Sequence, residues 1–179
     1  MDWLHRLTRG GVIAGVLALA VAAPAAASEP TYVRHGGYSA WDLPAGTACA
    51  FDVEGSPDNV TMAYGVGIRW DRSDGTVVHF TRAKGAYVNL ETGAQYPSED
   101  TYRDVSTYDA ATGILVGSES GPSTWSFLPG DQGPFGVVGE HGALYHFIGT
   151  ISYTYDLNVF QILRFSFTGS VEDVCAALS

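Results

Sequence analysis

The stretch Asn59–Trp70, NVTMAYGVGIRW, alternates large apolar residues with small or polar ones without a break. Because successive side chains of a strand point to opposite faces, this alternation predicts a β-strand with one apolar face. Gly65 and Gly67 fall on the other face, where glycines are typical of a strand that coils sharply or approaches another backbone. We therefore expect a strongly bent or closed sheet. The apolar parity, the large side chains from Val60 to Trp70, should face its core.

The same period of two recurs along the rest of the chain, and no segment shows a sustained helical period. Candidate strands cover residues 47–53, 59–70, 76–83, 86–90, 101–109, 114–120, 123–128, 144–155 and 159–171. Clusters of Gly, Pro, Asn and Asp separate them and supply turn chemistry. This pattern predicts an all-β domain over residues 47–179, preceded by an irregular segment over residues 28–46. We expect a single antiparallel β-barrel of about eight strands, with a β-sandwich as the alternative.

Turn chemistry predicts the register of two hairpins. Ser73-Asp74-Gly75 suits a three-residue loop with Gly75 in the left-handed conformation, which pairs Trp70 with Val78. Near the C-terminus, residues 156–158 suit a similar loop, with Asn158 left-handed. That loop pairs Ile151 with Leu163. We expect Leu163, Phe165 and Phe167 to point inward and Arg164 to face solvent.

The first 27 residues have the organisation of a secretory signal peptide. Arg6 and Arg9 give a basic start, an apolar run follows over residues 12–23, and Ala25-Ala26-Ala27 supplies a small-residue cleavage pattern. The apolar run is shorter than the roughly 20 residues that a membrane-spanning helix needs, which disfavours a retained anchor. We predict cleavage before Ser28 and a secreted, extracytoplasmic protein that no longer contacts the membrane.

Two cysteines, Cys49 and Cys175, lie near the start and the end of the expected β domain. An even pair in an exported protein predicts a disulfide. If Cys49 lies in the first strand and Cys175 follows the last, this bond brings the two strands together, as barrel closure requires. Neither cysteine has a CxxC or CxxH neighbour, so a zinc site is disfavoured. We expect no metal and no cofactor.

The chain is acidic, with a formal net charge of −10. Removing Arg6, Arg9 and Asp2 with the signal leaves 7 basic and 18 acidic residues, a net charge of −11. The acidic side chains are scattered, as on a solvated surface. Binding to phosphates needs clustered Lys and Arg, so the composition argues against a nucleic acid partner and against an anionic membrane surface.

Motifs for nucleophilic, phosphate-binding or zinc-protease chemistry are missing from the sequence. The C-terminal hairpin carries the one candidate constellation, a polar parity made of His146, Thr150, Ser152, Thr154, Arg164, Ser166 and Thr168. One interpretation is an ordinary solvent-facing surface. The other is a polar lumen in which Arg164 holds an anion or carbonyl group and His146 acts as an acid or base. His146 and Arg164 are therefore the candidate catalytic residues.

The ending FTGSVEDVCAAL, together with Cys49 in TACAFDV, resembles small exported β-rich proteins of uncharacterised function from high-GC Gram-positive bacteria. The resemblance covers the signal, the cysteine pair and the C-terminal strand. It implies no catalytic residue.

Three hypotheses for function follow from these features. The first is a binding barrel for a small apolar or amphipathic molecule. The second is a surface or interaction protein with a filled core, such as an inhibitor or a matrix component. The third is a barrel enzyme of the cyclase or isomerase type that uses His146 and Arg164. The sequence favours a protein without catalytic activity, and it predicts neither the ligand nor the oligomeric state.

Overall fold

The structure is a computed structural model that describes residues 31–35, 41–56, 65–72 and 74–179. Its elements are β1 (Thr31–His35), β2 (Trp41–Leu43), β3 (Val53–Ser56), β4 (Gly65–Asp71), β5 (Thr76–Asn89), β6 (Gln95–Asp109), β7 (Ile114–Phe127), β8 (Gln132–Gly133), β9 (Gly136–Val137), β10 (Ala143–Asp156), β11 (Gln161–Asp173) and α1 (Val174–Leu178). The predicted all-β class is confirmed. Within these ranges, no helix is long and apolar enough to cross a membrane.

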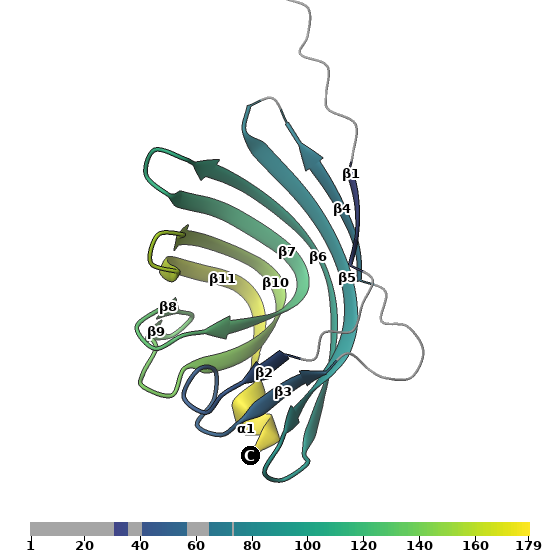
Figure 1. Cartoon of the computed structure of the whole chain (residues 1–179), viewed down its shortest axis with the longest axis vertical. Coiled ribbons are helices and arrows are strands. Elements are labelled where there is room, and N and C mark those ends of the chain that lie inside the picture. The colour runs from purple at the N-terminus through teal and green to yellow at the C-terminus, as the bar shows by residue number, and fades with distance from the viewer. Residues whose placement is uncertain (1–30, 36–40, 57–64, 73) are drawn as a thin grey trace, which may run out of the picture.

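Seven strands form one curled antiparallel sheet in the order β1-β4-β5-β6-β7-β10-β11 (Figure 1). The β2–β3 pair extends the sheet beside β5, and β8 and β9 form a separate two-stranded sheet. Among the described residues the strand order is open, with β1 and β11 at its two ends. The sheet is therefore a half-barrel, and closure into a full barrel stays a prediction.

The β4–β5 hairpin has the predicted register. Gly75 adopts a φ of +81°, Trp70 pairs with Val78, and Ile68 pairs with Phe80. Trp70 is half-buried, and its ring packs edge-on against Phe80 with 5.2 Å between ring centroids. The loop chemistry and the apolar parity point to the same pairing, which is why this register could be predicted.

Three glycines at one level of neighbouring strands bend the sheet sharply. Gly149 of β10 pairs with Gly121 of β7 and with Gly169 of β11, and their φ angles are +154°, +122° and +115°. A Cβ atom at Gly149 would overlap the carbonyl oxygen of Thr168, so a larger residue does not fit. Figure 1 shows β7, β10 and β11 curling back on themselves. We name the two sides of the bend the upper arms (residues 114–120, 150–156 and 161–168) and the lower arms (residues 122–127, 143–148 and 170–173).

The predicted register of the β10–β11 hairpin is wrong by four residues. Ile151 pairs with Phe167 rather than with Leu163. The turn covers residues 157–160, and its left-handed residue is Phe160, with a φ of +55°, rather than Asn158. A bulky residue seldom adopts this conformation, so the loop chemistry of the sequence did not reveal the longer turn.

A β-bulge at Leu163 explains the mixed parity of β11. Thr154 pairs with Arg164 and Tyr155 with Ile162, which leaves Leu163 between the two pairs. Ile162 is buried, whereas Leu163 is 43% exposed, so the prediction that Leu163 points inward is wrong. Beyond the bulge, Phe165 and Phe167 are half-buried against the core and Arg164 is exposed, as expected.

The two faces of the sheet differ in character. Trp70, Val78, Val105, Ser118, Ser152 and Ser166 pair in succession across six strands. Residues directly opposite each other on antiparallel strands share a face, so this row defines what we name the Trp70 face. Phe165 lies on the other face, which we name the aromatic face. The expectation that Trp70 and Phe165 both point to one interior is therefore wrong.

Aromatic side chains fill the space between the upper and lower arms. The buried residues of this cluster are three aromatic ones and two isoleucines: Phe127, Phe147, Tyr153, Ile151 and Ile162. The rings of Phe127 and Phe165, from opposite arms, stand edge to face with centroids 4.9 Å apart. This arrangement adds stabilisation of roughly 1 kcal/mol beyond apolar burial. The aromatic face is thus a filled core.

The predicted disulfide between Cys49 and Cys175 is confirmed, with 5.6 Å between the Cα atoms. Cys49 lies in the connection between β2 and β3 rather than in a strand, and Cys175 lies in α1. The bond therefore ties the β2–β3 pair to the helix that follows β11. A second buried cluster surrounds it and includes Val53, Leu144 and Leu178.

The N-terminal region departs from the prediction of an irregular segment over residues 28–46. It contains β1, which pairs with β4, and β2, which pairs with β3. Both strands depend on partners distant in the chain, and their short sequences carry little pattern of their own. The predicted signal peptide over residues 1–27, and residues 59–64 of the predicted strand 59–70, lie outside the described residues.

Candidate functional site

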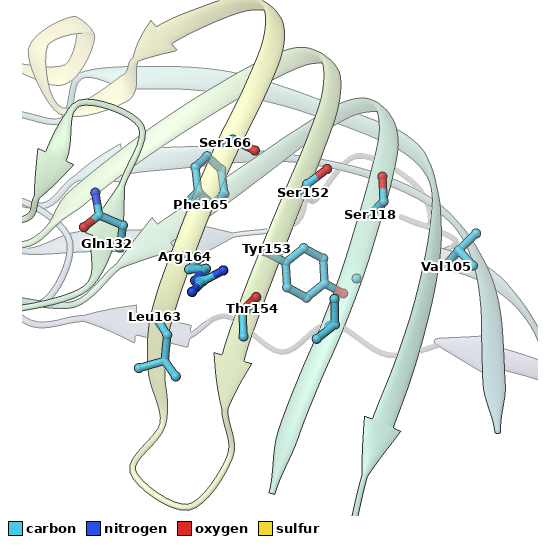
Figure 2. Close-up of a pocket in the computed structure, with 12 residues that line it drawn as sticks. Val105, Ser118, Gln132, Ser152, Tyr153, Thr154, Leu163, Arg164, Phe165 and Ser166 are labelled. Carbon is cyan, nitrogen blue, oxygen red and sulfur yellow. The ribbon is translucent and has the colours of Figure 1, made fainter. Parts of the chain in front are cut away.

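A groove of about 820 Å³ crosses the upper arms of β7, β10 and β11 (Figure 2). It is lined by Val105, Val116, Gly117, Ser118, Gln132, Ser152, Tyr153, Thr154, Leu163, Arg164, Phe165 and Ser166. Its volume lies within the range of about 300–1,000 Å³ that is usual for small-molecule sites. This groove is the candidate binding site.

Polarity changes across the groove from β6 to β11. Val105 and Val116 form its apolar end, and Val105 pairs with Val78 of the Trp70 face. Val116 is 54% exposed, so its side chain is available to a ligand. Hydroxyl side chains and Arg164 supply the polar groups at the other end, where Leu163 and Phe165 of β11 also line the groove. Small molecules that fit such a surface have an apolar body and one polar end.

Four side chains at the polar end form two rungs of the β10–β11 pair. Thr154 pairs with Arg164, and Ser152 pairs with Ser166. Because these four residues share a face, we name them the donor square. Paired Cβ atoms lie about 5 Å apart, and the two rungs are about 7 Å apart along the strands. All four side chains carry hydrogen-bond donors.

Within the part of the chain that the structure describes, the donor square has no internal partners. Among the described residues, no carboxylate forms an ion pair with Arg164, and no protein group bonds the side chains of Ser152, Thr154 and Ser166. None of the described residues that line the groove is Asp or Glu. Although the chain has a net charge of −10, the positive charge of Arg164 and the donors of the square are not neutralised or bonded by neighbouring groups of the described residues.

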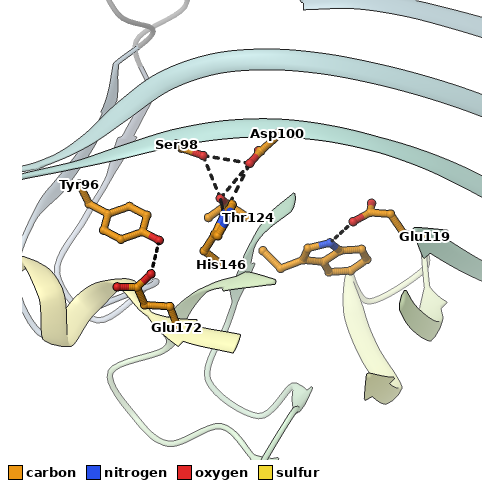
Figure 3. A network of polar contacts seen from close by, with 8 residues as sticks. Tyr96, Ser98, Asp100, Glu119, Thr124, His146 and Glu172 are labelled. Carbon is orange, nitrogen blue, oxygen red and sulfur yellow. Dashed lines mark hydrogen bonds and ion pairs between the residues drawn. The ribbon is translucent and has the colours of Figure 1, made fainter. Parts of the chain in front are cut away.

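A second polar cluster lies below the bend (Figure 3). The Asp100 Oδ1 atom accepts hydrogen bonds from Ser98 Oγ at 2.9 Å and from Thr124 Oγ1 at 3.1 Å. Thr124 Oγ1 also lies 3.0 Å from His146 Nδ1, which is 3.8 Å from Asp100 Oδ1. Burial raises the pKa of Asp100, although the two hydroxyl donors oppose that effect. The cluster joins β6 to the lower arms of β7 and β10.

Further carboxyl groups extend these contacts. Tyr96 Oη donates to Glu172 Oε2 at 2.8 Å, which links β6 to the lower arm of β11. The indole Nε1 of Trp125 donates to Glu119 Oε1 at 2.9 Å across the bend. Burial, together with the nearby acidic residues, raises the pKa of Glu119 to about 7. These contacts hold the arms in place.

The structure does not bring His146 and Arg164 together. His146 lies on a lower arm, whereas Arg164 pairs with Thr154 on the other side of the Gly149 bend. The side chains of His146 and Asp100 are 12% and 16% exposed, which leaves little room for a substrate. In the described ranges, no group of three or more His, Cys, Asp or Glu side chains is placed to hold a metal ion.

Sequence reasoning identified the polar side of the β10–β11 hairpin but missed the cluster below the bend. The cluster includes Ser98 and Asp100 of β6 and Thr124 of β7. These two strands stop pairing near Gly121, and beyond that point only side-chain hydrogen bonds connect them. The spacing of residues along the chain does not predict these contacts. Comparison with protein-family models, with curated proteins and with solved structures found no match. The function must therefore be argued from the site.

Proposed function

We propose that this protein is an exported binding protein for a small amphipathic molecule, which it holds in the groove across β7, β10 and β11. The observation that carries this proposal is the polarity of the groove. Val105 and Val116 offer an apolar surface at one end, and the donor square offers polar contacts at the other. A ligand that lies across the strands satisfies both ends at once.

Export is part of the proposal. The disulfide between Cys49 and Cys175 supports it, since such bonds persist in oxidising compartments. The signal-like residues 1–27 support it independently. N-terminal sequencing of the protein from culture medium should give Ser28 first. A chain that retains Met1 in the membrane fraction would contradict export.

Barrel closure is also a proposal, supported by the curl of the seven-stranded sheet. Closure requires hydrogen-bonding partners along the outer edge of β11. Slow amide hydrogen exchange at this edge, comparable with that of β10, would support it. Rapid exchange would support the open half-barrel.

Two substitutions in the groove lining test ligand binding. Val116→Asp adds a charge where the apolar body should rest, and Leu163→Asp adds a carboxylate beside Arg164, where the polar end should bind. Both positions are exposed enough to keep the fold. We expect the wild-type protein to retain a co-purifying small molecule in native mass spectrometry and both variants to lose it. Leu90→Asp, at a side chain 49% exposed outside the groove, is the matched control. A wild-type protein that carries no ligand and binds no added amphiphile would contradict the proposal.

An interaction protein with a filled core is the second candidate. Two observations favour it, the aromatic core between the arms and a set of exposed apolar side chains at loop ends. Phe135, Val137, Val159 and Phe160 are the most exposed of these side chains. If a partner binds these loop ends, the double variant Phe135→Ser, Phe160→Ser should lose partner binding. Val116→Asp and Leu163→Asp should leave partner binding unchanged.

A further inference from the structure

We propose that the groove selects ligands with an oxyanion head group, carboxylate, sulfate or phosphate, which the donor square binds through Arg164. This inference rests on the proposed function, because it names the polar end of the molecule that the groove holds. The strand register, the unpaired donors and the charge distribution of the groove support it.

The register of the β10–β11 pair determines the positions of the donors. Thr154 lies directly opposite Arg164, and the pair Ser152–Ser166 follows on the same face. A planar guanidinium can donate two parallel hydrogen bonds to one oxyanion. The neighbouring hydroxyls are close enough to donate to its remaining oxygens, given the spacing of about 5–7 Å between members of the square.

The charge distribution disfavours the other head groups. A cationic head would face Arg164, and no carboxylate among the described lining residues compensates. A neutral head can accept from the hydroxyls, but it gains nothing from the guanidinium charge. Hydrogen bonds to an ionised group are about twice as strong as those between neutral groups, so an oxyanion gains most from this site.

The apolar end sets the direction of the ligand. Val116 pairs with Thr154, so the apolar surface begins one strand away from the donor square. Val105 continues it on β6. A chain or ring system attached to the oxyanion would therefore run across the strands toward the Trp70 end of the sheet.

The test compares octyl probes that differ in the head group. Octanoate, octyl sulfate, octyl phosphate, octanol and octyltrimethylammonium are titrated by calorimetry into the mature, disulfide-bonded protein. We expect the three anions to bind roughly ten- to a hundredfold more tightly than octanol, and the cation to bind least. Differences among the three anions identify the preferred oxyanion. Added salt should weaken the binding of the anions and leave that of octanol unchanged.

Substitution of Arg164 separates this inference from the proposed function. Arg164→Gln should reduce anion affinity to the level of octanol, with octanol affinity unchanged. Arg82→Gln, at an exposed arginine of β5 outside the groove, should bind like the wild type. If octanol binds as tightly as the anions and Arg164→Gln changes nothing, the oxyanion inference is wrong and the groove proposal stands. If neither octanol nor any anionic probe binds to the wild type, the oxyanion inference and the groove proposal are both wrong.

Discussion

Glu119 is a buried carboxyl group whose protonation links the fold to pH. It lies on the aromatic face of β7, directly opposite Asp104 of β6, and it accepts a hydrogen bond from Trp125. Burial, the first of the causes, raises its pKa from the ordinary 4.5 to about 7. The folded state therefore favours the protonated form.

This shift predicts the direction of the pH dependence of stability. Because folding raises the pKa of Glu119, this residue contributes to the stability of the fold below pH 4.5. That contribution is lost as the pH rises through 7. Glu119→Gln keeps the acceptor for Trp125 and removes the charge. We expect the variant to be more stable than the wild type at pH 8, by about 3 kcal/mol at most, and to match it near pH 4.

Urea unfolding between pH 4 and pH 8 measures this effect. Glu99→Gln, at an exposed carboxyl group of β6, is the control and should keep the wild-type pH profile. Equal stability of wild type and Glu119→Gln at pH 8 would show that Glu119 ionises without cost in the fold.

At the scale of the element, the glycine row decides the shape of the sheet. Gly121, Gly149 and Gly169 let three neighbouring strands turn at one level, and the arms then enclose the aromatic core. Each of the three has a left-handed φ, and backbone of the adjacent strand lies where a Cβ would be. The bend also brings Thr124 and His146 against Asp100.

Gly149→Ala should therefore damage the fold. The added methyl group would overlap the Thr168 carbonyl oxygen and would impose a strained φ, at a cost of about 3 kcal/mol or more. Gly139→Ala is the matched control, because a Cβ at Gly139 meets nothing within 4 Å. Chemical denaturation of the two variants makes the comparison. A Gly149→Ala protein as stable as Gly139→Ala would mean that the bend needs no glycine there.

Prediction succeeded for elements whose local signals agree. Gly75 fixed the loop of the β4–β5 hairpin, and the apolar parity around Trp70 fixed the same register. It failed at the β10–β11 hairpin, where Phe160 is left-handed and Leu163 is bulged. Such features are unfavourable locally and are stabilised by tertiary contacts. One of these is the hydrogen bond from the Ile162 amide to the buried Asp131 carboxylate.

At the scale of the whole molecule, the disulfide joins parts of the described fold that are far apart in the chain. It connects the β2–β3 pair to α1 across a sequence separation of 126 residues. Closing so long a loop limits the unfolded chain and stabilises the native state by up to about 5 kcal/mol. Cys49→Ala with Cys175→Ala should lower the free energy of unfolding by several kcal/mol, as measured by denaturation. If the double variant matches the oxidised wild type, the bond does not contribute to stability.

The candidate site was predicted in part. Alternation along the C-terminal hairpin placed Ser152, Thr154, Arg164 and Ser166 on one polar face, and the structure pairs them into the donor square. The alternative in which His146 and Arg164 share one lumen finds no support, because the bend at Gly149 lies between them. The groove itself depends on the curl of the whole sheet, which no local pattern specifies.

If the groove binds an amphipathic molecule across the upper arms, amide chemical-shift mapping by NMR during titration with octyl sulfate should detect it there. We expect saturable shifts at Val116, Ser152, Thr154, Arg164 and Ser166, with little change at Asp100 and His146 below the bend. Shifts confined to the lower arms or to the exposed loop ends, or no saturable shifts at all, would contradict it.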